Sequence, residues 1–234
     1  MCQLSLLESL NKRKDELLQN HLYSHPFFVL IENGTLHEDR VKRLVIELAL
    51  FYDRVFDCVS PFLSSQEVKD VKEYLSYWYV HAMSNLNPDQ LAEEVKNLVF
   101  EEFDLEKTLA LPSGLAITNH MLYLSQNDPY AFIVCINTLF NEAWQTDRIL
   151  KALSSHKTYN RFYDIVKKIF MNLNLDKNVI DLLQDETSYL LSGEQRFLKQ
   201  LRLLVETFEI FFTEIAHEDN KDNQVRVGNS LQTI

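Results

Sequence analysis

Glycine is scarce in this chain, and its scarcity constrains the fold. Only four glycines occur among 234 residues, whereas average usage of roughly 7% would give about sixteen. Sheet-rich and doubly wound folds use glycine in tight turns and phosphate-binding loops. No stretch alternates apolar and polar residues over six positions, so we predict no β-sheet. The sequence therefore favours helices joined by few tight turns.

Several motifs are absent, and each absence excludes a class of site. The chain has no GxGxxG, GxxxxGK[ST], HExxH or GxSxG motif and no EF-hand loop, which excludes the enzyme and calcium-binding classes that depend on them. Its cysteines, Cys2, Cys58 and Cys135, are odd in number and lack CxxC spacing. No disulfide framework or zinc knuckle is therefore predicted, and Cys58 and Cys135 are interpreted as small buried residues.

Positive charge is also in deficit. The chain has 23 Lys and Arg against 34 Asp and Glu, a net charge of −11, which repels phosphate backbones and anionic lipid. The densest basic run, Lys12-Arg13-Lys14, adjoins two acidic residues, and we expect it to be a solvated helix face. No apolar run approaches the roughly 18 residues of a membrane span, and no secretory signal is visible. We expect a cytoplasmic protein without nucleic-acid or membrane partners.

The sequence that remains is rich in amphipathic helices. Hydrophobic residues make up 46% of the chain, and their spacing of three and four, with Pro and Gly at the breaks, marks the helices. We also expect a short segment over Pro26–Asn33 and a serine cap at Ser64-Ser65. Residues 1–218 are expected to form one domain, and residues 219–234 a mobile polar tail. The predicted helices cover approximately Ser5–Tyr23, Glu38–Leu63, Gln66–Ser84, Pro88–Phe103, Gly114–Ser125, Pro129–Leu153, Thr158–Asn172, Lys177–Leu191 and Glu194–Glu218.

Carboxylates within apolar helical stretches are the first candidates for a functional site. Glu47 lies in Leu44–Leu50 and either pairs with Arg43 on the outside or has an internal role. Glu142 lies in Phe140-Asn141-Glu142-Ala143-Trp144, among unusually many polar residues for so apolar a helix. A buried glutamate there must be stabilised by a cation or disfavoured by desolvation, and both arrangements are typical of functional sites.

Glu206 and Glu209 form a further pair. Their spacing of three places them on one face of the last helix. If solvated, they repel each other slightly; if buried, one must pair or take up a proton, which would supply an acid at neutral pH.

The densest aromatic run ends in a histidine, His81. Tyr74, Tyr77 and Trp78 precede it within one helix. Such a stripe is typical of a core, and the alternative is a pocket wall with a proton-shuttling or metal-binding imidazole.

The segment His25-Pro26-Phe27-Phe28 through Asn33-Gly34-Thr35-Leu36, followed by a long helix, resembles the opening of the TENA/thiaminase-II family. Phe132–Leu150 is similar to the central helix of that family, and Glu209–Ala216 to its closing helix. Relatives include pyrroloquinoline-quinone synthase and haem-oxygenase-like di-iron oxidases. The resemblance implies an all-α, single-domain bundle of haem-oxygenase-like type with about eight helices, a ligand cavity between helices and a homodimer.

The resemblance also implies a site. A small aromatic or heterocyclic molecule would bind in the central cavity, with Glu142 and Glu209 as an acid/base pair for hydrolysis of aminopyrimidine or thiamin-type C–N bonds, if catalysis occurs. The family's cysteine aligns near Phe140 or Asn141, and its aspartate at or beside Glu47. Substrate-binding residues would be Glu47, Tyr74, Tyr77, Trp78, His81 and Trp144.

Two alternatives remain open. One is metal-dependent oxidation with iron as cofactor, in which His81 and Glu142 resemble two of the di-iron ligands. The chain lacks the H-x-x-x-D-x-x-H helix of those oxidases, so no metal ligands are assigned. The other is a non-catalytic interaction protein whose cavity is filled by side chains such as Phe140 and Leu48.

Overall fold

The computed structural model describes residues 4–64, 68–99, 103–105, 107–175, 179 and 187–217, with the backbone alone for 4–10 and 187–192. Within these residues every regular element is helical, which confirms the predicted all-α class. The α-helices are α1 (Leu4–Leu18), α2 (Pro26–Glu32), α3 (Glu38–Leu63), α4 (Lys69–Asn85), α5 (Pro88–Val99), α6 (Pro112–Asn127), α7 (Pro129–Thr138), α8 (Thr146–Ser155), α9 (Tyr163–Leu173) and α10 (Thr187–His217). Two π-helical segments, η1 (Gln19–Tyr23) and η2 (Leu139–Ala143), and one 3₁₀ turn, η3 (Asn160–Phe162), join them.

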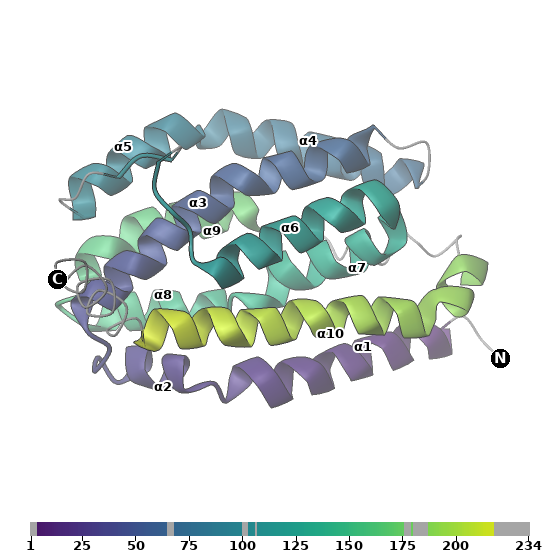
Figure 1. Ribbon diagram of the computed structural model, residues 1–234, viewed down its shortest axis with the longest axis horizontal. Helices are drawn as coiled ribbons and strands as arrows, with labels where there is room; N and C mark the ends of the chain where they lie inside the picture. The colour runs from purple at the N-terminus through teal and green to yellow at the C-terminus, as the bar shows by residue number, and fades with distance from the viewer. Residues whose placement is uncertain are drawn as a thin grey trace, which may run out of the picture.

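The helices form an elongated bundle around α3, α6 and α10. In Figure 1, α1 and α10 run side by side along one edge in the same direction, and α4 and α5 cover the opposite edge. The helices α3 and α6 pack closely, and α10 contacts both α6 and α7. Residues from the two ends of the chain therefore lie next to each other.

The central helix α3 covers the predicted range, Glu38–Leu63. The His37 side chain accepts a hydrogen bond from the Asp39 amide at its start, and acidic residues in the first turn complement the helix dipole. Most of the helix is buried, and Glu47 and Arg40 are among its buried residues. The strong apolar periodicity explains why this boundary was predictable.

The helix predicted over Pro129–Leu153 is wrong as one element. The α-helix α7 stops at Thr138, continues as η2, and is followed by Gln145, which has a left-handed backbone with φ +50°. A new helix, α8, then starts at Thr146. Apolar periodicity hides this break because Leu139, Phe140 and Ala143 of η2 are buried and continue the apolar pattern.

Other helix boundaries differ from the predicted ones. Ser64 does not cap a following helix but ends α3, and α4 starts after Val68, which has φ +50°. The last helix begins at Thr187 instead of Glu194. Most of the predicted helix Lys177–Leu191, the serine at position 65 and the tail over residues 219–234 lie outside the described residues.

The interior is dense and aromatic. Trp144 makes T-shaped contacts with Phe51, Phe208 and Phe211 at ring-centroid distances of 5.2, 5.0 and 5.5 Å. Such contacts contribute about 0.5–1.5 kcal/mol each beyond area burial. These aromatic rings therefore pack closely around Trp144, one of the residues predicted to line a ligand cavity.

Candidate functional site

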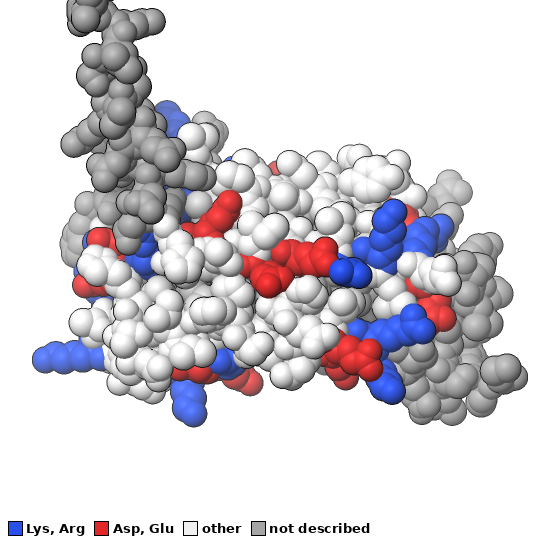
Figure 2. Space-filling model, turned by 60° about the horizontal axis from the view of Figure 1, so that its bottom comes forward, with Lys and Arg blue, Asp and Glu red and all other residues white. Residues whose placement is uncertain are grey.

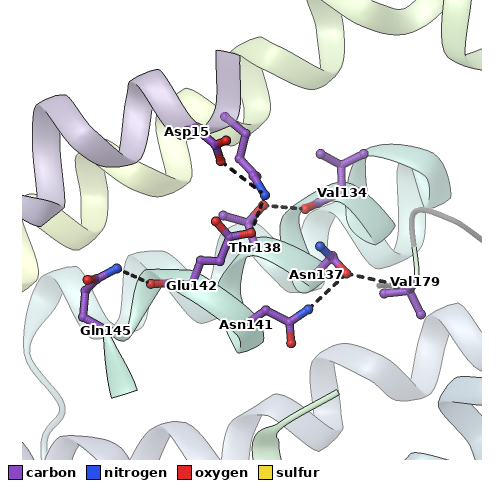
Figure 3. Close-up of polar contacts among 9 residues, drawn as sticks. Asp15, Val134, Asn137, Thr138, Asn141, Glu142, Gln145 and Val179 are labelled. Carbon is purple, nitrogen blue, oxygen red and sulfur yellow. Dashed lines mark hydrogen bonds and ion pairs between the residues drawn. The ribbon is translucent and has the colours of Figure 1, made fainter. Parts of the chain in front are cut away.

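The carboxylate of Glu142 is joined to Lys14 across the bundle. Glu142 lies on η2, and its Oε1 atom is hydrogen-bonded and ion-paired to Lys14 Nζ on α1. Asp15 Oδ1 lies 3.6 Å from the same Nζ. Figure 3 shows where α1 meets η2, with the Glu142 side chain directed toward the helix that carries Asp15 and Asn141 turned away toward Asn137. Glu142 is half-buried, and its pairing with a cation is one of the two arrangements that the sequence had suggested for a buried glutamate there.

Lys14 corrects the prediction that Lys12, Arg13 and Lys14 form a solvated face. Lys12 and Arg13 are exposed, whereas the Lys14 side chain retains only 11% of its exposure. A helix turns by about 100° per residue, so one member of a basic run can face inward. Burial of this ammonium is tolerated because Glu142 and Asp15 supply opposite charge.

A pocket opens beside Glu142. Its volume is about 440 Å³, within the range of roughly 300–1,000 Å³ that is typical of small-molecule sites. Its walls come from the end of η1, from η2 with the start of α8, and from α9. They combine aromatic rings with polar groups: Tyr23, Phe140, Asn141, Glu142, Gln145, Thr146, Asp147, Arg148, Leu150, Phe170, Met171 and Asn174.

The pocket wall contains unusual backbone. Both π-helical segments border it, through Tyr23 and Glu142, and π-helical turns occur frequently at functional sites. Gln145 keeps its left-handed conformation with two hydrogen bonds to the Glu142 carbonyl, from its own N–H at 3.1 Å and from Nε2 at 2.8 Å. A non-glycine residue held in this conformation costs about 1 kcal/mol or more.

Tyr23 connects the pocket with the charged pair. Burial and then the nearby Glu142 carboxylate raise the pKa of Tyr23, and a hydrogen bond with the Gln145 side chain partly opposes this. The phenol therefore stays protonated at neutral pH and can act as a hydrogen-bond donor. Sequence reasoning missed Tyr23 and Lys14, because each is brought to Glu142 by tertiary contacts alone.

Glu209, the proposed partner of Glu142, is engaged elsewhere. Its Oε2 lies 2.7 Å from His21 Nδ1 on η1, and its side chain is 43% exposed. Glu206 pairs with Arg202 on the surface at 2.6 Å. Glu209 is absent from the described lining of the Glu142 pocket. The structure thus attaches both predicted catalytic carboxylates to the α1–η1 segment, at different residues.

Glu47 both pairs with Arg43 and lies in the interior, although the sequence presented these as alternatives. It does pair with Arg43, whose Nη2 lies 2.6 Å from Oε1, yet the Glu47 side chain is only 2% exposed. The Leu111 amide donates a further hydrogen bond of 2.8 Å to Oε1. The packing at Gly114 is close, because a Cβ there would lie 2.8 Å from Glu47 Oε2 and would force this carboxylate to shift.

The interior beside Glu47 has almost no free space. A void of about 10 Å³ remains there, bordered by Phe51, Trp144 and Phe211 among others. This volume is near the minimum for one water molecule. Phe140 and Leu48 are also buried. The central site thus lacks room for a heterocycle in this conformation.

The predicted aromatic wall divides between core and surface. Trp78 and Trp144 are buried, and Trp78 packs on Phe140 at 5.1 Å, while Tyr74 is half-buried. Tyr77 is 70% exposed and stacks on the exposed His81 at 6.1 Å. His81 is hydrogen-bonded to Asn85 on the outer side of α4. The structure therefore does not bring Tyr77 or His81 to the Glu142 pocket.

The described residues offer neither a cluster of metal ligands nor a reactive cysteine. Across the described ranges, no three His, Cys, Asp or Glu side chains gather closely enough to hold a metal ion. This donor set does not fit an iron centre built on His81 and Glu142. Cys58 and Cys135 are buried, and desolvation raises the pKa of Cys58 to about 12 and that of Cys135 further. Neither thiol can act as a thiolate at neutral pH.

The outer face of α1, α2 and α10 carries charges of both signs. Figure 2 shows acidic and basic side chains interspersed on this face, and the pairs Arg13–Glu194 and Arg202–Glu206 belong to α1 and α10. Among the described helices, none is both long and apolar enough to cross a bilayer.

Comparison with known proteins identifies the fold. No family model and no curated protein matches the sequence. A solved structure from Sulfolobus solfataricus P2, described as a TenA-like thiaminase, aligns with a TM-score of 0.60 and 14% identity over 91% of this chain and 96% of its own. A domain of unknown function from Shewanella denitrificans OS217 aligns with a TM-score of 0.54 and 14% identity over 100% of this chain and 98% of its own. At this identity the likeness concerns the fold, and the chain has the haem-oxygenase-like fold that the sequence resemblance predicted.

Proposed function

We propose that this protein binds a small, flat heterocyclic amine in the Glu142 pocket at the side of the bundle. One observation carries the proposal: a hollow of about 440 Å³ places a carboxylate beside aromatic rings and amide groups, within strained backbone. Large pockets with a few convergent polar groups are the usual place for small ligands. The filled interior beside Glu47 offers no comparable space.

The chemistry of the pocket favours an aminopyrimidine-like ligand. A protonated ring nitrogen and a neighbouring amino group present two parallel N–H donors, which match the two oxygens of a carboxylate such as Glu142. The rings of Tyr23, Phe140 and Phe170 border the same space and can pack on a flat heterocycle. Asp147 adds a second negative charge to the wall.

Lys14 competes with such a ligand for Glu142. Its ammonium group pairs with Glu142 Oε1, and Asp15 Oδ1 lies 3.6 Å from it on the same helix. A cationic ligand would take the place of Lys14 at Glu142, and Lys14 would then pair with Asp15. Lys14 therefore lowers the affinity for a cationic amine.

Isothermal titration with 4-aminopyrimidine tests the proposal. We expect binding to the wild type, no binding of unsubstituted pyrimidine, and roughly tenfold or greater weakening in Glu142→Gln, since a hydrogen bond to a charged group contributes about 1.5–3 kcal/mol. Glu206→Gln, which alters a surface carboxylate outside the pocket, is the matched control. Equal affinities for wild type and Glu142→Gln would overturn the proposal.

The Lys14→Met variant supplies a test of opposite sign. Removal of the competing ammonium should tighten 4-aminopyrimidine binding several-fold. Lys168→Met, which breaks the exposed pair with Glu94, should leave binding unchanged. Weaker binding in Lys14→Met would show that the ligand does not compete with Lys14.

Hydrolysis of the C–N bond of an aminopyrimidine is the candidate activity at this site. The solved structure described as a TenA-like thiaminase supports testing it. Glu142 would accept a proton from the water as its oxygen bonds to the carbon, and would return that proton to the nitrogen that leaves as the C–N bond breaks. The products would be a hydroxylated pyrimidine and ammonia from an aminopyrimidine, or a hydroxylated pyrimidine and the free thiazole from thiamin. Release of ammonia or of thiazole, lost in Glu142→Gln, is the measurement. Loss in Glu209→Gln as well would support the original acid/base pair.

Three further expectations concern iron, a role without catalysis and the oligomeric state. Iron-dependent oxidation has no suitable donor set among the described residues. An interaction protein without catalysis is supported by the filled interior, and absence of binding by any heterocycle would favour it. A homodimer in the cytoplasm stays part of the proposal, and light scattering of the purified protein measures its oligomeric state.

A further inference from the structure

Arg148 makes an unusual set of contacts next to the pocket. Its Nε and Nη2 atoms donate to the two oxygens of Glu32, at 2.6 and 2.8 Å, and its guanidinium group lies 4.6 Å from the centre of the Phe28 ring. Its remaining nitrogen, Nη1, donates to the carbonyl oxygen of Tyr23 at 2.6 Å. One side chain thus joins α8 to α2 and to the end of η1.

The Tyr23 contact has a structural reason. Tyr23 is the last residue of η1, and the final carbonyls of a helical segment lack partners within it. Arginine satisfies this carbonyl and the Glu32 carboxylate at once, because its planar fork carries five donors in fixed geometry. Lysine could not reproduce the same arrangement.

Through its backbone, Arg148 is also connected to Gln145, which belongs to another wall of the pocket. It follows the left-handed Gln145 by one helical turn, and the Arg148 amide donates to the Gln145 carbonyl at 3.0 Å. Tyr23 and Gln145 both line the Glu142 pocket. Arg148 therefore links two walls of the pocket, one through its side chain and one through its backbone.

We propose that Arg148 is a positioning residue for the Glu142 pocket, which it shapes by holding Tyr23 on η1 against the start of α8, with Glu32 fixing the guanidinium. The inference rests on the proposed function for its ligand, but the structural part is independent of any ligand. Glu32 lies outside the described pocket lining, so a change at Glu32 affects the pocket through Arg148.

Hydrogen exchange of the ligand-free protein tests the structural part. Arg148→Lys and Glu32→Gln should both accelerate amide exchange in residues 19–25 and 144–148. The matched control is Arg161→Lys, because Arg161 also pairs with a glutamate, Glu38, and also lies 4.6 Å from a phenylalanine ring, Phe162, on a segment outside the described pocket lining. Unchanged exchange in both test variants would overturn the proposal.

Titration with 4-aminopyrimidine tests the consequence for the site. At a temperature where all variants are fully folded, Arg148→Lys and Glu32→Gln should weaken binding about tenfold, and Arg161→Lys should not. Equal weakening in all three would show a general structural effect and overturn the specific role. If wild type binds no heterocycle, the proposed function fails, while the exchange experiment still decides whether Arg148 positions η1.

Discussion

Two carboxylates of this bundle, Glu47 and Glu142, show how the same residue type has different consequences in different surroundings. Both lie in apolar helical stretches and both pair with a basic side chain. Glu47 is enclosed by close packing around a void of about 10 Å³, whereas Glu142 borders a pocket of about 440 Å³. The Glu47 pair therefore contributes to the integrity of the bundle, while in our proposal the half-buried Glu142 also binds a ligand.

The largest expected effect concerns the aromatic filling of the interior. Phe211 is 1% exposed and contacts Trp144, so Phe211→Ala should lower the free energy of unfolding by about 3–5 kcal/mol through lost burial and a residual cavity. Met171→Ala is the comparison at the pocket, because Met171 is 68% exposed, and its cost should stay below about 0.5 kcal/mol. Urea unfolding measures both. Equal costs would contradict the contrast between filled interior and open pocket.

The second-largest expected effect is a difference in stability loss between variants of the two carboxylates. Glu47→Ala leaves Arg43 and the Leu111 amide without this acceptor and should cost about 3 kcal/mol, as for other broken buried pairs. Glu142→Ala should cost about 1 kcal/mol, because Lys14 can turn toward Asp15. Urea unfolding at pH 7 gives both values. A larger loss for Glu142 than for Glu47 would reverse their roles.

The smallest expected effect is a pH dependence at His25, which caps the start of α2. Burial lowers the pKa of His25 from its usual 6.5. The nearby Glu209 carboxylate opposes this shift, and His217 adds to it. Its Nδ1 accepts a hydrogen bond from the Phe27 amide at 3.2 Å, so the neutral ring carries its proton on Nε2, 3.0 Å from Thr213 Oγ1. The unfolded chain binds this proton at higher pH than the folded one, so the stabilisation is complete above pH 6.5 and is lost as pH falls through the lower folded pKa.

Urea unfolding between pH 7.5 and 5.5 measures this contribution. The free energy of unfolding should fall toward acid by at most about 1.4 kcal/mol per pH unit from this group. His25→Asn keeps a capping acceptor for α2 without a titratable ring, so its pH dependence should be flatter. Parallel profiles for wild type and variant would exclude His25 as the cause.

Part of the molecule was predictable because it depends on local pattern. The boundaries of α3 follow from a continuous apolar stripe, and Pro88 and Pro129 start their helices where a missing amide is harmless. The resemblance around His25-Pro26 gave the haem-oxygenase-like fold, which the solved structures support. The break at Gln145 was missed, since a single left-handed residue leaves no periodic signature.

The site was predictable only in part. Glu142 was singled out because its segment is unusually polar for so apolar a helix, but its partner, Lys14, is 128 positions away in the chain. Periodicity could not show whether Lys14 or Lys12 faces inward, or that Glu209 meets His21. Such pairings depend on how helices from the two ends of the chain lie together, which no local pattern records.

The sequence by itself determined an all-helical chain, since scarce glycine and apolar spacing of three and four leave little scope for sheet. Only the tertiary structure decided which cavity stays open. Phe51 of α3, Trp144 after η2 and Phe211 of α10 meet beside Glu47 and leave a void of only about 10 Å³, whereas the two π-helical segments and the turn at Gln145 border a larger space beside Glu142. Packing density is a property of side chains from distant helices together, and this is why it emerges only in the folded chain.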